Sequence, residues 1–210
     1  MKKILCRTLV LGVSLSFSGC SSNLEAATKV SSSSFVSQIA KEVNHPGLDF
    51  QAASSPQVLA DLATTVFVGE VIGVRGTREW VSKSLQGTYL KTTVFEVRVF
   101  SSIKGGLNQD DVVLVEAMLS PKNSNSALES RIKGLKVGVF SVAAKFESET
   151  DIYKGDFILE PNTKFFTTTG PQGFVLSNPD DANLYWPVLN DVEQGTLADA
   201  MPGGSVIPKE

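Results

Sequence analysis

The sequence predicts a mainly β fold, an antiparallel β-barrel or similar curved sheet with one or two short peripheral helices. Its clearest strand is TTVFEVRVF, where Phe95, Val97 and Val99 fall on one face. Glu96 and Arg98 fall on the other face, as expected of a sheet that is wet on one side. The second observation is that β-branched segments alternate with turn-rich segments along most of the chain.

Glycines inside the first expected strand, residues 65–74, are the third observation. Gly69 and Gly73 interrupt the run TVFVGEVIGV. Glycine within a strand often marks a bulge or a sharp bend. Because such bends allow a sheet to curl, these two positions favour strong curvature.

The remaining strands are expected in short apolar runs bounded by turns. Pro171 and its flanking glycines predict a tight turn, after which residues 174–177 return as a partner strand. The expected strands are residues 111–117, 136–146, 156–160 and 164–169. Loops are expected at residues 75–87 and 120–130, and residues 178–187 are expected to form an ordered loop or edge.

Helix signals are few. Ser55 is a good N-cap and Pro56 suits the first helical position, so a short helix is expected there. Residues 35–41 predict only a brief amphipathic turn. A last helix is expected to start near Asn190 and to fray at Pro202.

The first residues have the order that export requires: a cationic start, a short apolar run and small residues before a cysteine. The apolar run, residues 8–17, is too short to span a bilayer, which takes about 20 apolar residues. The motif FSGC resembles a bacterial lipobox, although Phe17 departs from the usual aliphatic residue. Cys20 is then the acylated residue. The alternative is ordinary secretion with cleavage near Ala26.

These features predict residues 1–19 as signal peptide, 20–54 as lipidated Cys20 and a Ser-rich flexible tether, 55–189 as the β-barrel domain and 190–210 as a C-terminal helix or tail. The expected location is the cell membrane or outer membrane, on the extracytoplasmic face. Two acyl chains would hold the protein firmly, since each buried methylene contributes about 0.8 kcal/mol. The other cysteine, Cys6, lies in the signal, so no disulfide is expected.

Charge argues against a nucleic-acid partner. The formal net charge of the whole chain is −3, and loss of the three cations Lys2, Lys3 and Arg7 with the signal makes it −6. The remaining basic residues are scattered among acidic ones rather than clustered, whereas phosphate binding needs clustered Lys and Arg.

A family resemblance rests on the order of ADLATTVFVGEVIGV, TVFEVRVFSSIKGG, DDVVLVE, GLKVGVFSVAAKF and GPQGFVL. Together these segments, from Ala60 to Leu176, resemble the netrin-like domain shared with tissue inhibitors of metalloproteinases. The resemblance implies an OB-like β-barrel. In those inhibitors an N-terminal cysteine chelates the target's zinc, but Cys20 is expected to be acylated, so the resemblance does not imply protease inhibition here.

The sequence has few side chains in patterns that suit catalysis or metal binding. His45 is the only histidine and lies in the turn NHPG, which argues for an exposed loop residue and against multi-histidine metal sites. The acidic segment 147–151 could bind calcium, but it lacks the pattern of an EF-hand. No catalytic constellation, cofactor or metal is expected, and we expect no enzyme activity.

Two aromatic pairs remain as ligand-binding candidates. Tyr185 and Trp186 would suit a sugar or peptide groove if exposed, although packing over a barrel end is the simpler interpretation. Trp80 and Tyr89, on the long loop before the clearest strand, form the second pair. The sequence thus favours an envelope module that binds a protein, peptide or glycan. A structural or assembly accessory and a carboxylate-dependent hydrolase are the alternatives.

Overall fold

The computed structural model describes residues 34–47, 49–83, 87–146, 151–156, 159–178, 180 and 182–208. In the strand segments 87–89 and 151–153 it describes the backbone alone. Cys20 and the signal segment therefore lie outside the described residues. The predicted mainly β class is confirmed, because most of the described elements are strands joined in one nine-stranded sheet.

The elements and their bounds are as follows. The helices are α1 (Ser34–Ala40), α2 (Pro56–Leu62), α3 (Asn125–Ile132) and a short 3-10 turn, η1 (Pro171–Gly173). The strands are β1 (Val43–Asn44), β2 (Thr65–Ser82), β3 (Gly87–Lys104), β4 (Val112–Ala117), β5 (Ser120–Pro121), β6 (Lys136–Ala143), β7 (Asp151–Gly155), β8 (Phe165–Thr168), β9 (Phe174–Ser177), β10 (Asn183–Trp186) and β11 (Asp191–Gln194). Among the described helices, none has the length and apolar character needed to cross a membrane.

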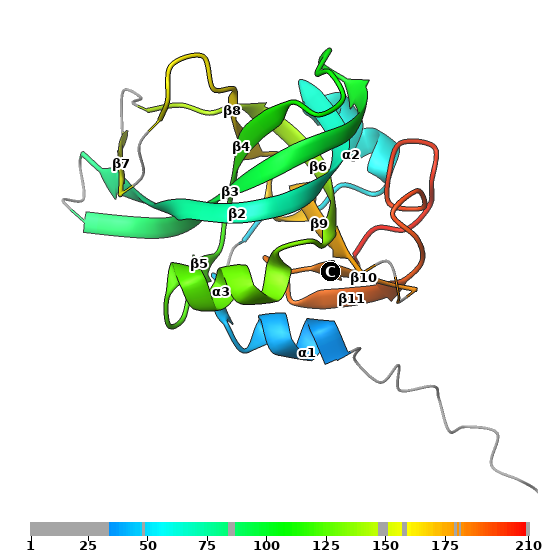
Figure 1. The fold of residues 1–210 in the computed structure, drawn as a ribbon, viewed down its shortest axis with the longest axis horizontal. Coiled ribbons are helices and arrows are strands. Elements are labelled where there is room, and N and C mark those ends of the chain that lie inside the picture. The colour runs from blue at the N-terminus through cyan, green and yellow to red at the C-terminus, as the bar shows by residue number, and fades with distance from the viewer. Residues whose placement is uncertain are drawn as a thin grey trace, which may run out of the picture. The chain divides into compact units, whose positions relative to one another are not determined.

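Five strands of the sheet close on one another in a ring (Figure 1). β2 pairs with β3, β3 with β4, and β4 runs parallel to β8. β8 pairs with β6, and β6 pairs back with the first part of β2. The far part of β2 pairs instead with β7, while β9, β10 and β11 extend the sheet from β6.

Strong bending of β2 makes this closure possible, and it occurs where the glycines predict it. The pairing with β3 shifts register at Gly69 and again at Gly73. At Gly69 the partner strand lies so close that a Cβ atom would overlap the Arg98 carbonyl oxygen and lie 2.7 Å from Val97 Cγ1. Glycine at this position lets the two backbones approach, which a larger residue would prevent.

The main hydrophobic cluster lies on the face of β3 that the alternation predicts. Phe95, Val97 and Val99 are buried, while Glu96 is half-buried and Arg98 is exposed. α1 and α3 cover this cluster from below in Figure 1. The β3 face therefore follows directly from the period of two in the sequence.

The helix expected after Ser55 is confirmed. Ser55 Oγ accepts a hydrogen bond from the Val58 backbone N–H at 3.2 Å, and Pro56 occupies the first helical position. Leu59 and Ala60 of α2 pack into a second buried cluster with Met201 from the C-terminal segment. This cluster covers the part of the sheet opposite to α1.

The loop expected at residues 120–130 is wrong in part, because α3 forms there. Ser124 caps this helix, with its Oγ accepting from the Ala127 N–H at 3.1 Å. Leu128 and Ile132 are 1% exposed and pack against the main cluster. Only these two apolar residues, four positions apart, point inward, which is too weak a period to read in a polar segment.

The folded unit begins earlier than the predicted domain start at residue 55. Phe35, Val36 and Ile39 of α1 are buried in the main cluster, and Val43 of β1 is fully buried. β1 pairs with β5. Residues 34–47 and 49–54 therefore belong to the fold rather than to the flexible tether expected over 20–54.

The C-terminal prediction is also corrected. β11 forms at Asp191–Gln194 in place of a helix, and it pairs with β10. Leu197, Ala200 and Met201 are buried in the second cluster, so this segment is not a loose tail. Gly195 and the turns that follow it direct these side chains back onto the sheet.

Three smaller expectations differ as well. Residues 75–82 continue β2 instead of forming a loop, because β3 pairs with them along nearly their whole length. The strand expected at 156–160 lies earlier, as β7. β9 pairs with β6 and β10 rather than with β8. Each difference reflects a long-range pairing that local propensity does not encode.

Candidate functional site

A pocket of about 310 Å³ lies between the far part of β2, the end of β6 and β8. Its size falls at the lower end of the range typical of small-ligand sites. The described lining residues are Trp80, Met118, Val142, Ala143, Lys145 and 167–170. Apolar surface dominates the lining, and the polar groups are the threonine hydroxyls and the Lys145 ammonium.

Trp80 is the one predicted ligand-binding residue that lines this pocket. It lies on β2 opposite Leu90 of β3, and its side chain is half-buried. The indole Nε1–H donates to Glu116 Oε1 at 3.3 Å. A tryptophan held at its polar atom and partly open at its ring is suited to contact a ligand.

Behind the pocket wall lies an ion pair between Arg78 and Glu116. Arg78 Nη1 donates to Glu116 Oε2 at 2.7 Å, and both side chains are 1% exposed. Thr167 Oγ1 donates to the same oxygen at 2.8 Å, while Thr92 Oγ1 donates to Oε1 at 2.5 Å. With the Trp80 indole, the carboxylate accepts four hydrogen bonds, which matches its roughly four lone-pair sites.

The Arg78 guanidinium has further contacts that account for its burial. Its Nη2 donates to the Lys145 carbonyl oxygen, which ties the start of the β6–β8 connection to β2. The guanidinium carbon lies 5.0 Å from the ring centroids of both Phe146 and Phe165. Aromatic faces stabilise a cation at this distance, so the two rings compensate the Arg78 charge together with the Glu116 carboxylate.

Strand alternation places Glu116 on this side of the sheet. Its neighbours Val115 and Ala117 pack into the main cluster, so the Glu116 side chain points to the opposite face. Sequence reasoning missed this residue and Arg78. The available signal was a single glutamate inside the apolar run VVLVEA, because a carboxylate within a buried strand needs a buried partner.

The arrangement gives the pocket a pre-formed wall. Trp80 and Thr167 line it and both donate to one buried carboxylate, which fixes their orientation. Thr168 and Thr169 also line it, and each carries a buried hydroxyl without a hydrogen-bond partner among the described residues. A fixed aromatic and apolar wall with a few polar groups is typical of small-molecule sites.

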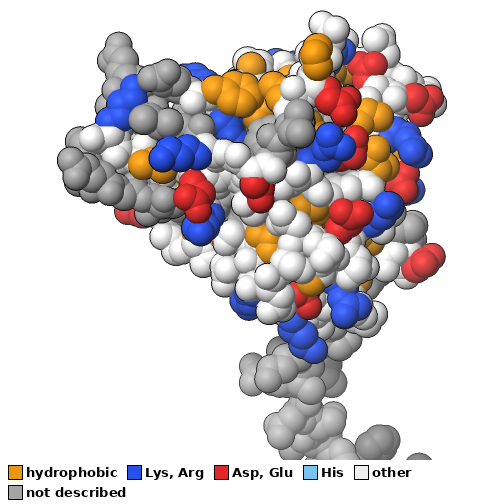
Figure 2. Space-filling model, turned by 60° about the vertical axis from the view of Figure 1, so that its left-hand side comes forward, with side chains coloured by type: hydrophobic (Ala, Val, Ile, Leu, Met, Phe, Trp, Pro, Cys, Tyr) orange, Lys and Arg blue, Asp and Glu red, His pale blue; other side chains and the backbone are white. Residues whose placement is uncertain are grey.

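The face shown in Figure 2 carries Lys and Arg side chains mixed with Asp and Glu. Hydrophobic side chains appear between them in small groups. On the described part of this face the charges are thus interspersed, as on an ordinary solvated surface.

The aromatic pair Tyr185 and Trp186 is not exposed, so it does not form the sugar or peptide groove for which it was a candidate. Tyr185 is 0% exposed within the main cluster, and its hydroxyl donates to Asn190 Oδ1 at 3.1 Å. Burial raises the pKa of Tyr185. Trp186 is 2% exposed in the second cluster. Both residues therefore pack the fold, and the Tyr89 side chain lies outside the described residues.

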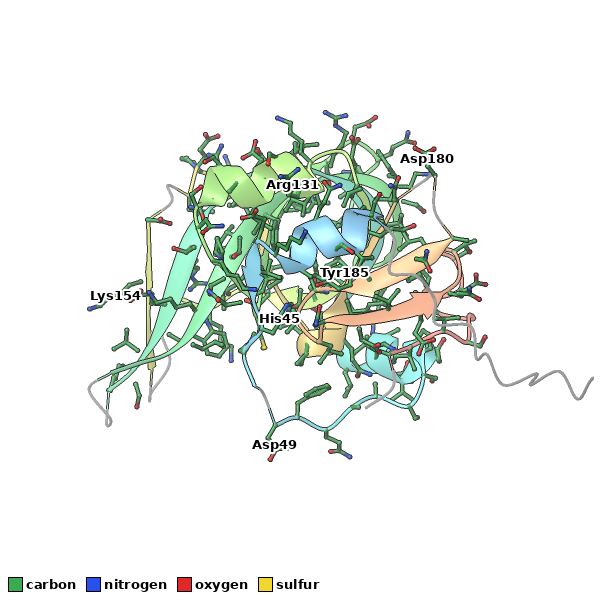
Figure 3. All side chains as sticks on the ribbon, turned by 90° about the horizontal axis from the view of Figure 1, so that it is seen from below. His45, Asp49, Arg131, Lys154, Asp180 and Tyr185 are labelled. Atoms are coloured by element: carbon green, nitrogen blue, oxygen red, sulfur yellow. The ribbon has the colours of Figure 1, made fainter. Side chains whose placement is uncertain are left out.

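His45 is half-buried rather than solvent-exposed. Its Nδ1 lies 2.9 Å from the Pro187 carbonyl oxygen, to which it donates a hydrogen bond. Burial lowers the pKa of His45, against the opposing effect of this hydrogen bond. Figure 3 shows His45 beside the end of β10 near Tyr185 and away from the β2–β3 hairpin that carries Trp80.

Acidic side chains meet in one other hollow. Arg75 lies 3.9 Å from Glu96 and 3.6 Å from Glu160 across a space of about 320 Å³. Residues 147–150 of the proposed calcium segment lie outside the described residues. Within the described part of the chain, no group of three or more His, Cys, Asp or Glu side chains could hold a metal ion.

Comparison of the chain with protein-family models, with curated proteins and with solved structures finds no match in any of the three.

Proposed function

We propose that this protein is a lipid-anchored module of the bacterial cell envelope that binds a ligand in the Trp80 pocket. The observation that carries the proposal is the half-buried Trp80 at the wall of a mostly apolar pocket, fixed by a buried carboxylate. Such pre-organisation reduces the entropy lost on binding. An accessory with no small ligand has no need of a wall built in this way.

The strand order supports an OB-like barrel for this module. Counted along the chain, the five ring strands are β2, β3, β4, β6 and β8, and their order in the ring is first, second, third, fifth and fourth. The third and fifth run parallel, and α3 lies between the third and fourth. This order supports an OB-type barrel, the fold that the netrin-like resemblance implies.

OB-type barrels bind ligands near the loops that join their first two and last two strands. Trp80 lies near the β2–β3 connection, and Lys145 begins the connection from β6 to β8. The pocket occupies this region. In Figure 1, α1 lies at the bottom of the folded unit and β8 at the top.

The hydrolase alternative has weaker support. Glu96 and Glu160 share a hollow, but Arg75 lies between them as the ion-pair partner of both. Both carboxylates thus face one guanidinium, whereas the two carboxyl groups of a glycosidase face the bond to be cleaved. We therefore favour binding over hydrolysis.

The binding proposal is tested by capture of envelope components on the full-length protein, purified in detergent. Trp80→Ala is expected to lose a specific captured component, and Phe100→Ala, which removes an exposed aromatic of β3 outside the pocket, is expected to retain it. Urea unfolding of both variants controls for stability. Equal capture by the wild type and Trp80→Ala would contradict the proposal.

The anchor is tested separately by intact-mass analysis of the membrane fraction. We expect the wild-type protein to begin at Cys20 and to carry acyl chains, and Cys20→Ala to lack them. A wild-type product released without acylation would refute the anchor and leave the pocket proposal unaffected.

A further inference from the structure

A second hollow adjoins the Trp80 pocket. It measures about 160 Å³, and its walls include Phe50, Leu59 and Leu62. The same two residues, Thr169 and Gly170, line both hollows. These two residues therefore form a low divide with an apolar hollow on each side.

The second hollow is also pre-formed. Gln172 is 2% exposed, and its side-chain amide clamps the backbone of Ala53. Its Oε1 accepts from the Ala53 N–H at 2.7 Å, and its Nε2 donates to the Ala53 carbonyl at 3.3 Å. This pair of bonds holds the segment that carries Phe50 against η1.

The divide is open above Gly170. This glycine has φ +67°, and a Cβ atom built on it would meet no atom within 4 Å. A ligand that fills both hollows would have to pass over this residue.

The linings favour a peptide over a glycan. Each hollow offers mainly apolar walls. An extended peptide can present an apolar side chain to each of them. A sugar chain carries hydroxyls on every unit and would need polar partners inside both hollows.

Charge complementarity further limits which residues the peptide can carry. Lys145 is the single charged residue among the described lining residues of the two hollows. The ammonium lies on the Trp80 side. A neutral or acidic residue next to the first apolar side chain is therefore favoured over a basic one.

Resting on the proposed function, we infer that the ligand is an extended peptide that crosses Gly170 and places two apolar side chains in the two hollows. Residues i and i+2 of an extended peptide point to the same face, about 6.6 Å apart, whereas adjacent residues point to opposite faces. Apolar residues at i and i+2 can therefore enter two hollows on one side of the peptide, whereas adjacent ones would point apart.

The test uses capped pentapeptides of serine that contain one apolar residue, two adjacent ones, or two at i and i+2, with Leu, Ile, Val, Met and Phe in all pairs. Each set is made with a flanking Asp or a flanking Lys. Fluorescence anisotropy with the full-length protein in detergent is expected to show about tenfold tighter binding of the i, i+2 set, equivalent to about 1.4 kcal/mol.

Two variants are designed to prevent the peptide from reaching the second hollow, each with a matched control. Gly170→Asn places a side chain over the divide; because φ +67° with ψ −176° is a backbone conformation nearly confined to glycine, urea unfolding of this variant is measured beside its binding. Gly106→Asn is its control, with φ +67° and equally open surroundings. Leu62→Asp places a charge at the second hollow, and Val58→Asp, also exposed on α2, does not line it.

We expect Gly170→Asn and Leu62→Asp to lower the affinity of i, i+2 peptides to that of single-residue peptides, and both controls to bind as the wild type. No advantage of the i, i+2 set, or an unchanged affinity in Gly170→Asn, would overturn the inference. If single-residue peptides still bind in a Trp80-dependent way, the proposed function survives that result. If Trp80→Ala leaves all peptide binding unchanged, the proposed function fails too.

Discussion

Glu116 joins four strands through one carboxylate. Its partners are Arg78 and Trp80 on β2, Thr92 on β3 and Thr167 on β8, with Glu116 itself on β4. A buried ion pair adds little net stability, because desolvation of both charges opposes their attraction. Its value here lies in fixing which residues of the four strands face one another.

Removal of Glu116 alone should reveal the free-energy cost of burying the Arg78 charge. We expect Glu116→Ala to lower the free energy of unfolding by about 3 to 5 kcal/mol, because the Arg78 charge remains buried without its carboxylate. The double variant Arg78→Met, Glu116→Leu should be more stable than the single one. Glu79→Ala, which removes a half-exposed partner of Lys91, should cost no more than about 1 kcal/mol.

Urea unfolding measures these differences. A single variant that is as stable as the double one would show that the Arg78 charge finds water or another partner when Glu116 is absent.

His45 predicts a pH dependence of stability. Its pKa in the fold is lowered from 6.5, chiefly by burial, so the unfolded chain binds a proton more readily. Stability should therefore be full above pH 6.5 and should fall as the pH drops from there through the lowered pKa. His45→Asn can still donate to the Pro187 carbonyl but does not titrate, so it should flatten this part of the profile.

Thermal unfolding at a series of pH values tests this expectation. The pKa values of Asp111 and Asp199 are lowered from 3.8, by hydrogen bonds from Lys164 and Thr196 respectively, so their effects belong to more acidic solutions. A decline below pH 6.5 that persists unchanged in His45→Asn would assign it to another group.

At the scale of elements, β2 determines the closure of the ring. Its first part pairs with both β3 and β6, and its second part with β3 and β7. The strand has to coil for the ring to close, and the register shifts along its pairing with β3, which include those at Gly69 and Gly73, are places where it can do so.

The two glycines should differ sharply on substitution by alanine. A Cβ at Gly69 overlaps the Arg98 backbone, whereas the nearest atom to a Cβ at Gly73 is Glu96 Oε2 at 3.4 Å. We expect Gly69→Ala to cost about 1 to 3 kcal/mol and Gly73→Ala to change the free energy of unfolding by no more than about 0.5 kcal/mol. Urea unfolding distinguishes them, and equal values would mean that β3 moves aside at little cost.

At the scale of the whole molecule, α1 links the N-terminal segment to the core. Its contribution is three buried side chains, Phe35, Val36 and Ile39, which pack beside α3 and β10. Arg131 of α3 adds a hydrogen bond to Gln38 at 3.2 Å. Figure 3 shows the two helices side by side, with Tyr185 near α1.

If the fold begins with α1, Ile39→Ala should be costly. Ile39 is 1% exposed, so its truncation should lower the free energy of unfolding by about 2 to 4 kcal/mol. Lys41→Ala, at an exposed position just after the helix, should have an effect of no more than about 0.5 kcal/mol. A small effect of Ile39→Ala in calorimetry would restore the domain start predicted at residue 55.

Local rules made part of the structure predictable. The β3 faces, the α2 cap at Ser55 and the bends at Gly69 and Gly73 each depend on residues close in sequence, and each is confirmed. Trp80 was singled out as an aromatic near a turn, and it does line the pocket. The export signal and the Cys20 anchor remain predictions from sequence.

Tertiary structure decided the rest, because the deciding contacts join residues far apart along the chain. The pair Arg78 and Glu116 and the burial of Tyr185 and Trp186 depend on which strands meet. A tryptophan has the same local pattern whether it packs a core or borders a pocket. The sequence by itself determined the two faces of β3, the cap of α2 and the glycine positions at which β2 shifts register. Only the closed pairing of the strands determined which side chains surround the pocket, because hydrogen bonding between distant strands is cooperative and is not a property of any one segment.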